Sequence, residues 1–398
     1  SSGQIHSTTC IAQDRRSGNT QVWYAGTGEI RGSTTNATRW GSLYLGDGIF
    51  KSTDSGQSWT LLPATSSGTP QVTDPFDYVI NVATNPANAG QDEVLAATYL
   101  GVYRSTDGGG SWTTALASDS GLTDVAVTAA GVMYASTRVG SLIRVWRSTN
   151  GTAWTLIQPA TFPTAANRVV IGLAPSNPQV VYFFVQGANN TPAVAGHQLW
   201  KYTYVSGNGS GAGGIWENRG ANLPSDINTQ TGYDQIVHVK PDDEQFVVIG
   251  GTNLYRSTNG FATAAATTVI GGYSFYPGGN HHPDLHAGAF NPADSKVYYS
   301  AGDGGVARAA DITVPAMVWT SLNHGYNVTQ FYSVAIAPDG GSDVILAGAQ
   351  DNGSQLGNAP GASNWVQAFG GDGTVVEVSP AADDRLYTQY QSGPIQRQ

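Results

Sequence analysis

The sequence predicts an all-β protein, a β-propeller of four-stranded blades. A short hairpin sequence recurs along the 398 residues, and its copies are spaced by about 40 to 55 residues, the length of one propeller blade. Most intervals also contain a pair of strands with alternating β-branched and aromatic residues, such as 78–86 followed by 93–106. The composition, with 51 glycines, 10% aromatic and 12% charged residues, favours strands and turns over long helices.

The repeats predict seven blades and a partial eighth unit at the C-terminus. The clear copies are STDSGQSWT at 52–60, STDGGGSWT at 105–113, STNGTAWT at 148–155 and STNGFAT at 257–263. A degenerate unit runs through Trp200 and residues 207–220, and two weaker copies end in Trp319 and Trp365. We expect residues 1–373 to form the propeller. Residues 374–398 begin a further repeat, which either closes the ring or starts a second domain.

The recurring sequence is interpreted as scaffold, joining the third strand of a blade to its outer strand. A tight hairpin needs a residue that tolerates positive φ, here glycine, and a side chain that caps free backbone N–H groups, here Asp or Asn. The tryptophan one strand later is large enough to fill the wedge between neighbouring blades. The residues given this structural role are Asp54, Trp59, Asp107, Trp112, Asn150, Trp154 and Asn259.

The pattern Ser-x-Asp-x-Gly-x-x-Trp, at 52–59 and again at 105–112, resembles the Asp-box (BNR repeat) of sialidases, xyloglucanase-type glycoside hydrolases, sortilin-type receptors and photosystem assembly factors. The resemblance implies a propeller. It implies little about activity, because families with unrelated functions share the motif. Sialidase chemistry needs a cluster of arginines for a carboxylated sugar, whereas Arg104, Arg147, Arg256 and Arg308 fall at equivalent third-strand positions and are interpreted as structural.

The strand order predicts where function lies. Successive turns of an antiparallel blade alternate between the two faces of the disc, so the second-to-third turns and the links between blades share the face opposite the repeated hairpins. We call this the top face, where propellers present variable loops. The segments predicted to lie there carry these candidate ligand-binding residues: Glu29, Trp40, Asp77, Tyr233, Asp234, His282, Asp284, His286, Tyr326 and Gln330. Aromatic faces and carboxylates of this kind are typical of sugar-binding clefts.

Three further top-face carboxylates, Asp303, Asp351 and Asp372, are the candidate catalytic residues. The turn around Asp303 is similar to the Asp-x-Gly-Gly turn that carries a catalytic carboxylate in xyloglucanase-type glycoside hydrolases. The alternative is a turn-capping aspartate before glycines.

The segment HHPDLH could present three metal ligands if it is extended, because His282, Asp284 and His286 would then point to one side. The alternative is that the three residues fix a loop entry by hydrogen bonding. We therefore expect no required cofactor and allow for a bound metal ion at this segment.

The formal net charge of −10 and the pI near 5.0 argue against a nucleic-acid partner. No apolar run reaches transmembrane length, so we expect no direct membrane insertion. Cys10 is the single cysteine, and the sequence features together suggest a secreted or cell-surface protein.

The expected function is binding or adhesion to a glycan or an extracellular protein. The alternative is a glycoside hydrolase that acts on a neutral polysaccharide with two top-face carboxylates.

Overall fold

The regular secondary structure of the protein, described from a computed structural model, consists of strands and short 3-10 helices. The structure describes residues 7–29, 44–71, 73–119, 121–140, 142–163, 165–187, 196–273, 281–324, 329–338, 344–357, 365–380, 385–390 and 393–397. The chain divides into two compact units, residues 1–300 with 309–319 and residues 301–308 with 320–398. The predicted boundary at residue 374 lies within the second unit, and the role of 374–398 stays a prediction.

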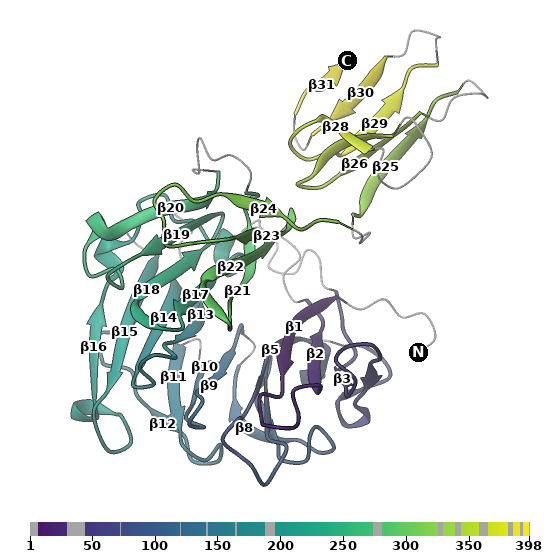
Figure 1. The fold of residues 1–398 in the computed structure, drawn as a ribbon. Coiled ribbons are helices and arrows are strands. Elements are labelled where there is room, and N and C mark those ends of the chain that lie inside the picture. Colours follow the sequence, from purple (N-terminus) through teal and green to yellow (C-terminus); the bar gives the residue numbers. More distant parts are fainter. Residues whose placement is uncertain are drawn as a thin grey trace. The chain divides into compact units, whose positions relative to one another are not determined.

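Five four-stranded antiparallel sheets lie wholly in the first unit, each with its strands in chain order (Figure 1). Their strands are β1 (Thr8–Gln13), β2 (Trp23–Thr27), β3 (Ile49–Ser52), β4 (Thr60–Leu61); β5 (Val79–Thr84), β6 (Val94–Thr98), β7 (Gly101–Ser105), β8 (Thr113–Ala117); β9 (Asp124–Val127), β10 (Met133–Val139), β11 (Leu142–Ser148), β12 (Thr155–Leu156); β13 (Ala166–Leu173), β14 (Val180–Gly187), β15 (His197–Tyr204), β16 (Gly214–Asn218); β17 (Ile236–Lys240), β18 (Asp243–Gly250), β19 (Asn253–Ser257) and β20 (Thr267–Gly272). Short 3-10 helices are η1 (Pro63–Thr65), η2 (Pro75–Asp77), η3 (Gly211–Gly213), η4 (Gly220–Asn222), η5 (Gln230–Gly232) and η6 (Ala264–Ala266).

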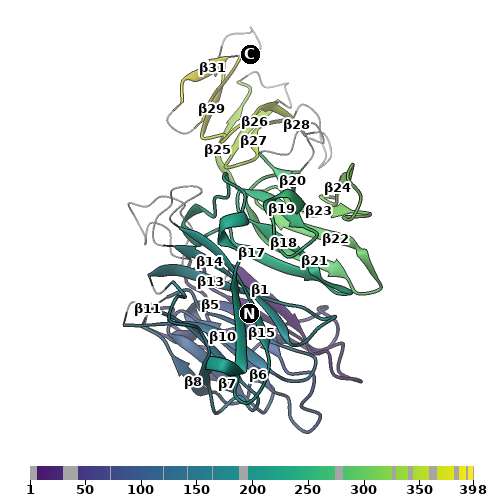
Figure 2. The same cartoon turned by 90° about the vertical axis from the view of Figure 1, so that its left-hand side faces the viewer.

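A sixth four-stranded sheet is divided between the units, and the second unit holds two more sheets, visible in Figure 2. The divided sheet consists of β21 (Leu285–Asn291), β22 (Asp294–Gly302), β23 (Gly305–Ala309) and β24 (Trp319–Ser321). The second unit's own strands are β25 (Phe331–Ile336), β26 (Ile345–Ala349), β27 (Gly353–Gly357), β28 (Trp365–Phe369), and the three-stranded set β29 (Val375–Val378), β30 (Leu386–Gln389) and β31 (Ile395–Arg397).

Consecutive sheets of the first unit pack face to face along the chain. The innermost strands β1, β5, β9, β13 and β17 contact one another in that order. Each interface has its own apolar core, and β14, a second strand, is buried along its whole length because neighbouring sheets cover both faces. This explains why its sequence, VVYFFVQG, is apolar without alternation. The predicted all-β propeller fold of four-stranded blades is confirmed. The number of blades in a ring stays a prediction.

The repeated hairpins join β3 to β4, β7 to β8, β11 to β12 and β19 to β20, as predicted. In the second copy, Asp107 Oδ1 accepts from Ser111 N at 2.9 Å and from the Ser105 hydroxyl at 2.7 Å. The Ser105 hydroxyl in turn accepts from Gly109 N at 2.8 Å. The leading serine therefore caps the turn together with the aspartate, a role that the sequence analysis did not assign.

The hairpin backbone explains the glycines. Two consecutive residues have positive φ in the second copy, Gly108 at 68° and Gly109 at 95°. The fourth copy places Phe261 at the second of these positions with φ of 58°. Its ring is fully buried in the core between sheets β13–β16 and β17–β20. Burial of this ring offsets the strain of a left-handed conformation.

The first two hairpins give a pH prediction. Hydrogen bonds, the strongest from the Ser58 and Ser111 side chains, lower the pKa of Asp54 and Asp107 to about 2. Because the folded pKa lies below the unfolded value of about 3.9, this stabilisation is complete above that pH and is lost as the pH falls toward 2. We expect the melting temperature of Asp107→Asn to depend less on pH between about 4 and 2 than that of the parent. Identical pH profiles would contradict this explanation.

Basic side chains of the third strands connect successive blades. Lys51 Nζ donates to Gly108 O of the next hairpin at 3.1 Å. Arg147 lies over the Tyr204 ring, 4.1 Å from its centroid, and Arg256 donates to Val314 O at 2.8 Å. Arg147 and Arg256 thus have the structural role that the sequence predicted for them.

Candidate functional site

The candidate ligand-binding and catalytic residues lie in the connections between strands that the sequence predicted. Glu29 follows β2, Asp77 ends η2 before β5, and Tyr233 and Asp234 precede β17. In the second unit, Asp303 lies between β22 and β23, and Asp351 between β26 and β27. Trp40 and Tyr326 lie outside the described residues.

Four of the predicted residues meet in the first unit although they come from three distant segments of the sequence. The Tyr233 hydroxyl donates to Glu29 Oε1 at 2.9 Å. The Tyr233 ring meets the His286 ring edge to face, with centroids 4.7 Å apart. His286 Nε2 lies 3.6 Å from Asp234 Oδ1. We call Glu29, Tyr233, Asp234 and His286 the Tyr233 cluster.

Exposure differs within the cluster. Tyr233 and Glu29 are half-buried and the His286 side chain is 33% exposed, so these three can meet a ligand. Asp234 and Asp77 are fully buried, so their side chains do not reach the surface. Asp77 accepts from Gln71 N at 2.5 Å, and burial raises the pKa of its carboxyl group.

The backbone beneath the cluster is strained. Gln230 and Thr231 have φ of 45° and 62°, and Asp284 has φ of 63°. A β-branched residue such as Thr231 rarely adopts this conformation, and strain of this kind concentrates at functional sites. The segment is held by Arg168, whose Nη1 donates to Gly232 O at 2.8 Å and to Tyr233 O at 3.1 Å.

The backbone at HHPDLH differs from the extended conformation on which the metal prediction rests. The positive φ of Asp284 breaks the extended conformation that would have aligned the three side chains. Asp284 Oδ1 instead accepts from Gln230 Nε2 at 2.8 Å, and His282 Nδ1 lies 3.0 Å from Pro283 O. Among the described residues, His282, Asp284 and His286 do not form a common group of ligand atoms. The hydrogen-bonding alternative fits these three residues.

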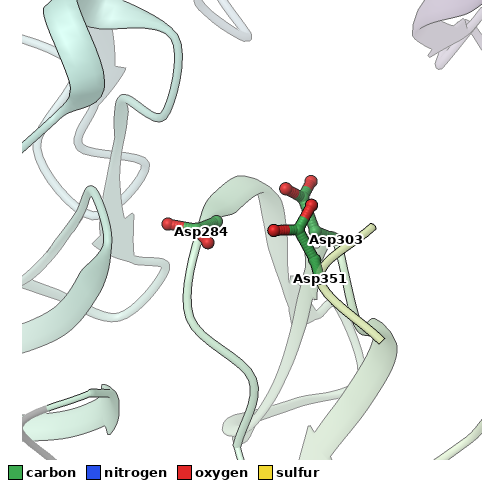
Figure 3. A group of neighbouring side chains, drawn as sticks. All are labelled: Asp284, Asp303 and Asp351. Atoms are coloured by element: carbon green, nitrogen blue, oxygen red, sulfur yellow. The ribbon is translucent and has the colours of Figure 1, made fainter. Parts of the chain in front are cut away.

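The second unit brings the candidate catalytic residues together. One carboxylate oxygen of Asp303 and one of Asp351 lie within 4.8 Å of each other, and Figure 3 shows the two side chains next to one another. Asn352 Nδ2 donates to Asp303 O at 3.2 Å, which joins the two turns. Asp372 Oδ1 accepts from Asp351 N at 2.9 Å, so Asp372 shapes the turn in which Asp351 has φ of 59°. Gln330 is exposed in this unit.

The Asp303 and Asp351 pair can perform two kinds of chemistry. Two carboxylates this close to each other can act as an acid and a base, or as an acid and a nucleophile. Carboxylate oxygens are also the ligands that hard divalent cations prefer. The Asp372 carboxylate already accepts a hydrogen bond from Asp351 N, so it is the least suited of the three to catalysis.

Sequence reasoning missed the buried polar residues that support the cluster. Arg168, Gln186, His197 and Gln235 lie around the segment before β17, yet three of them lie in strands whose patterns indicate only packing. The available sequence signal for these residues was Gln186, a polar residue near the end of the otherwise apolar strand β14.

No protein-family model matches the chain, and no curated protein matches it. Several solved structures match the chain. The GH74 enzyme of Niastella koreensis superimposes over 96% of this chain and 62% of its own, with a TM-score of 0.54 and 18% identity. An ancestral GH74 enzyme is similar over 99% of this chain and 56% of its own, with a TM-score of 0.46 and 17% identity.

A third match, the GH74 xyloglucanase of Xanthomonas campestris, covers 97% of this chain and 62% of its own, with a TM-score of 0.41 and 15% identity. The chain thus spans less than two thirds of these structures. The similarity to the Niastella koreensis enzyme supports the propeller fold. No helix in the described residues is both long and apolar enough to cross a membrane.

Proposed function

We propose that this protein is an Asp-box β-propeller that binds a neutral glycan outside the cell through the Tyr233 cluster. The observation that carries the proposal is the half-exposed Tyr233 ring, held by the Glu29 carboxylate and the His286 ring. The capped hairpins support the Asp-box assignment. The net charge of −10 disfavours an anionic ligand.

The cluster offers the two kinds of contact that sugars need. An aromatic ring fixed in orientation can stack on the apolar face of a pyranose with little loss of conformational entropy. The Glu29 carboxylate, which accepts from Tyr233 and Ser7, has further lone pairs that can accept hydrogen bonds from hydroxyl groups around the stacked ring. An extracellular protein with an exposed polar loop is the other partner that this surface could fit.

Tyr233→Ala is expected to weaken binding to a neutral polysaccharide by roughly tenfold, the effect of losing about 1.4 kcal/mol of contact energy. Tyr233→Phe should weaken it less, since the ring remains and only the bond to Glu29 is lost. Binding can be measured by affinity electrophoresis on plant and microbial polysaccharides. Tyr273→Ala, which removes a tyrosine that is 70% exposed outside the cluster, is the matched control.

A parent protein that bound none of these polysaccharides, or a Tyr233→Ala variant with parental affinity, would contradict the proposal. Melting temperatures of all variants distinguish a local loss of contacts from unfolding, because ligand binding and global stability are measured separately.

A second candidate function is hydrolysis of a neutral polysaccharide, favoured by the proximity of Asp303 and Asp351. Their oxygens lie closer to the separation of about 5 to 5.5 Å used by retaining glycosidases than to the 6.5 to 9.5 Å of inverting enzymes. If this function holds, Asp303→Asn and Asp351→Asn should each abolish sugar release. Asp372→Asn should retain activity, because an amide oxygen can still accept from Asp351 N. No sugar release by the parent would exclude this function.

A further inference from the structure

A row of polar side chains closes one end of the interface between sheets β13–β16 and β17–β20. Arg168 of β13, Gln186 of β14 and His197 of β15 are paired directly across the three strands. Directly paired residues project from the same face of a sheet, so the three side chains form one row. The next row on this face, two residues along each strand, is Val170, Phe184 and Leu199, all in the buried core shared with the following sheet.

The segment 229–235 covers this polar row. Arg168 Nη1 bonds two carbonyl groups of the segment, as described above. His197 Nε2 lies 2.8 Å from Thr229 Oγ1, and Gln235 Nε2 donates to Phe184 O at 2.8 Å. A Cβ atom at position 232 would lie 3.1 Å from Arg168 Cβ and 3.3 Å from Gln235 Oε1. The backbone of the segment therefore packs closely against the row at Gly232. We call Arg168, Gln186, His197 and Gln235 the buried polar layer.

The layer has hydrogen-bonding capacity that the protein does not use. Gln186 is fully buried, and in the part of the chain that the structure describes neither atom of its amide has a partner. The same is true of three other buried side-chain atoms, Arg168 Nε, His197 Nδ1 and Gln235 Oε1. Buried polar atoms without partners are rare in native proteins, since the lost hydration is not replaced. Five of them around one segment therefore indicate an occupant.

The chemistry of these atoms selects the occupant. Arg168 Nε and the Gln186 NH2 group can only donate, whereas the two amide oxygens can only accept. Burial lowers the pKa of His197 to about 4, so its ring is neutral at pH 7 and offers one nitrogen of each kind. The Arg168 charge is already faced by Asp124 and Asp234, so no unbalanced positive charge is left to hold an anion, and the Arg168 Nε and Gln186 NH2 donors do not suit a cation. A small neutral molecule that both donates and accepts fits this set.

We propose that the buried polar layer is an internal hydration site, in which ordered water joins strands β13–β15 to the segment 229–235. A buried water molecule makes about three hydrogen bonds, so the layer takes about two or more. These waters fix the segment that carries Tyr233, and the site exists whether or not Tyr233 binds a glycan.

The sign of one stability change tests this inference. Gln186→Met keeps the shape of the side chain but removes both polar atoms. If the layer holds water, the waters lose two partners and the melting temperature falls. If the layer is dry, the substitution removes an amide buried without compensation, and the melting temperature rises. Gln179→Met, at an exposed glutamine just before the same strand, is the matched control and should leave it unchanged.

A crystal structure of the parent chain gives an independent test that does not depend on how the variant folds. We expect water density within about 3.2 Å of the Gln186 amide and of either Arg168 Nε or His197 Nδ1. A rise in melting temperature for Gln186→Met, a dry layer, or another side chain occupying it in the crystal would each overturn the inference.

Discussion

Asp124→Asn is expected to lower the free energy of unfolding by about 3 kcal/mol, because it breaks a buried connection among three sheets. Asp124 begins β9 and is 8% exposed. Its Oδ1 accepts from Asn81 Nδ2 of β5 at 2.7 Å and from Val125 N at 2.8 Å, and its Oδ2 accepts from Ile171 N of β13 at 2.9 Å. Both oxygens of the carboxylate are therefore used.

An asparagine at position 124 can supply only one oxygen. Its NH2 group would face either the Ile171 N–H or the two donors on the other side, so at least one buried donor would lose its acceptor. Chemical denaturation measures the loss. Asp243→Asn is the matched control, because Asp243 is exposed and its single acceptor role toward Gln245 N is one that asparagine can keep. Equal effects at the two positions would contradict the proposed role of Asp124.

The sequence predicted the blades well because their signals are local. Each repeated hairpin is decided within a few residues, by serine and aspartate caps and by residues that reach positive φ. Strand alternation then assigns the connections to faces without any tertiary information. The sequence also predicted the connections that carry these residues, Glu29 after β2, Tyr233 before β17 and Asp303 between β22 and β23.

The details of the site could not be predicted, because they depend on contacts between distant segments. Tyr233 meets Glu29 from more than 200 residues away, and nothing in either local sequence indicates the pairing. The metal prediction at HHPDLH likewise rested on local sequence alone. It assumed an extended backbone, whereas the contact of Asp284 with Gln230 accompanies a left-handed conformation at Asp284. The complete burial of Asp77 and Asp234 could likewise not be predicted, because it depends on packing between distant segments.

Trp112→Ala is expected to lower the free energy of unfolding by about 3 kcal/mol, through a cavity between the sheets β1–β4 and β5–β8. The Trp112 ring packs against Phe76, with centroids 5.3 Å apart, and against the core that contains Tyr24 and Val94 from the two sheets. Trp154 has the same place at the next interface. Trp112 and Trp154 thus each pack against the apolar core between two neighbouring sheets.

Trp59, the equivalent residue of the first hairpin, is the matched control within the same chain. It is 37% exposed, and its Nε1 donates to Gly56 O at 3.1 Å. In the part of the chain that the structure describes, Trp59 is not among the side chains that pack on the cores containing Trp112 and Trp154. Trp59→Ala should therefore cost about 1 kcal/mol or less, because less apolar area is lost and the neighbourhood can be refilled by solvent. Equal losses for Trp59→Ala and Trp112→Ala in urea denaturation would show that the ring stabilises its own hairpin rather than the contact between blades.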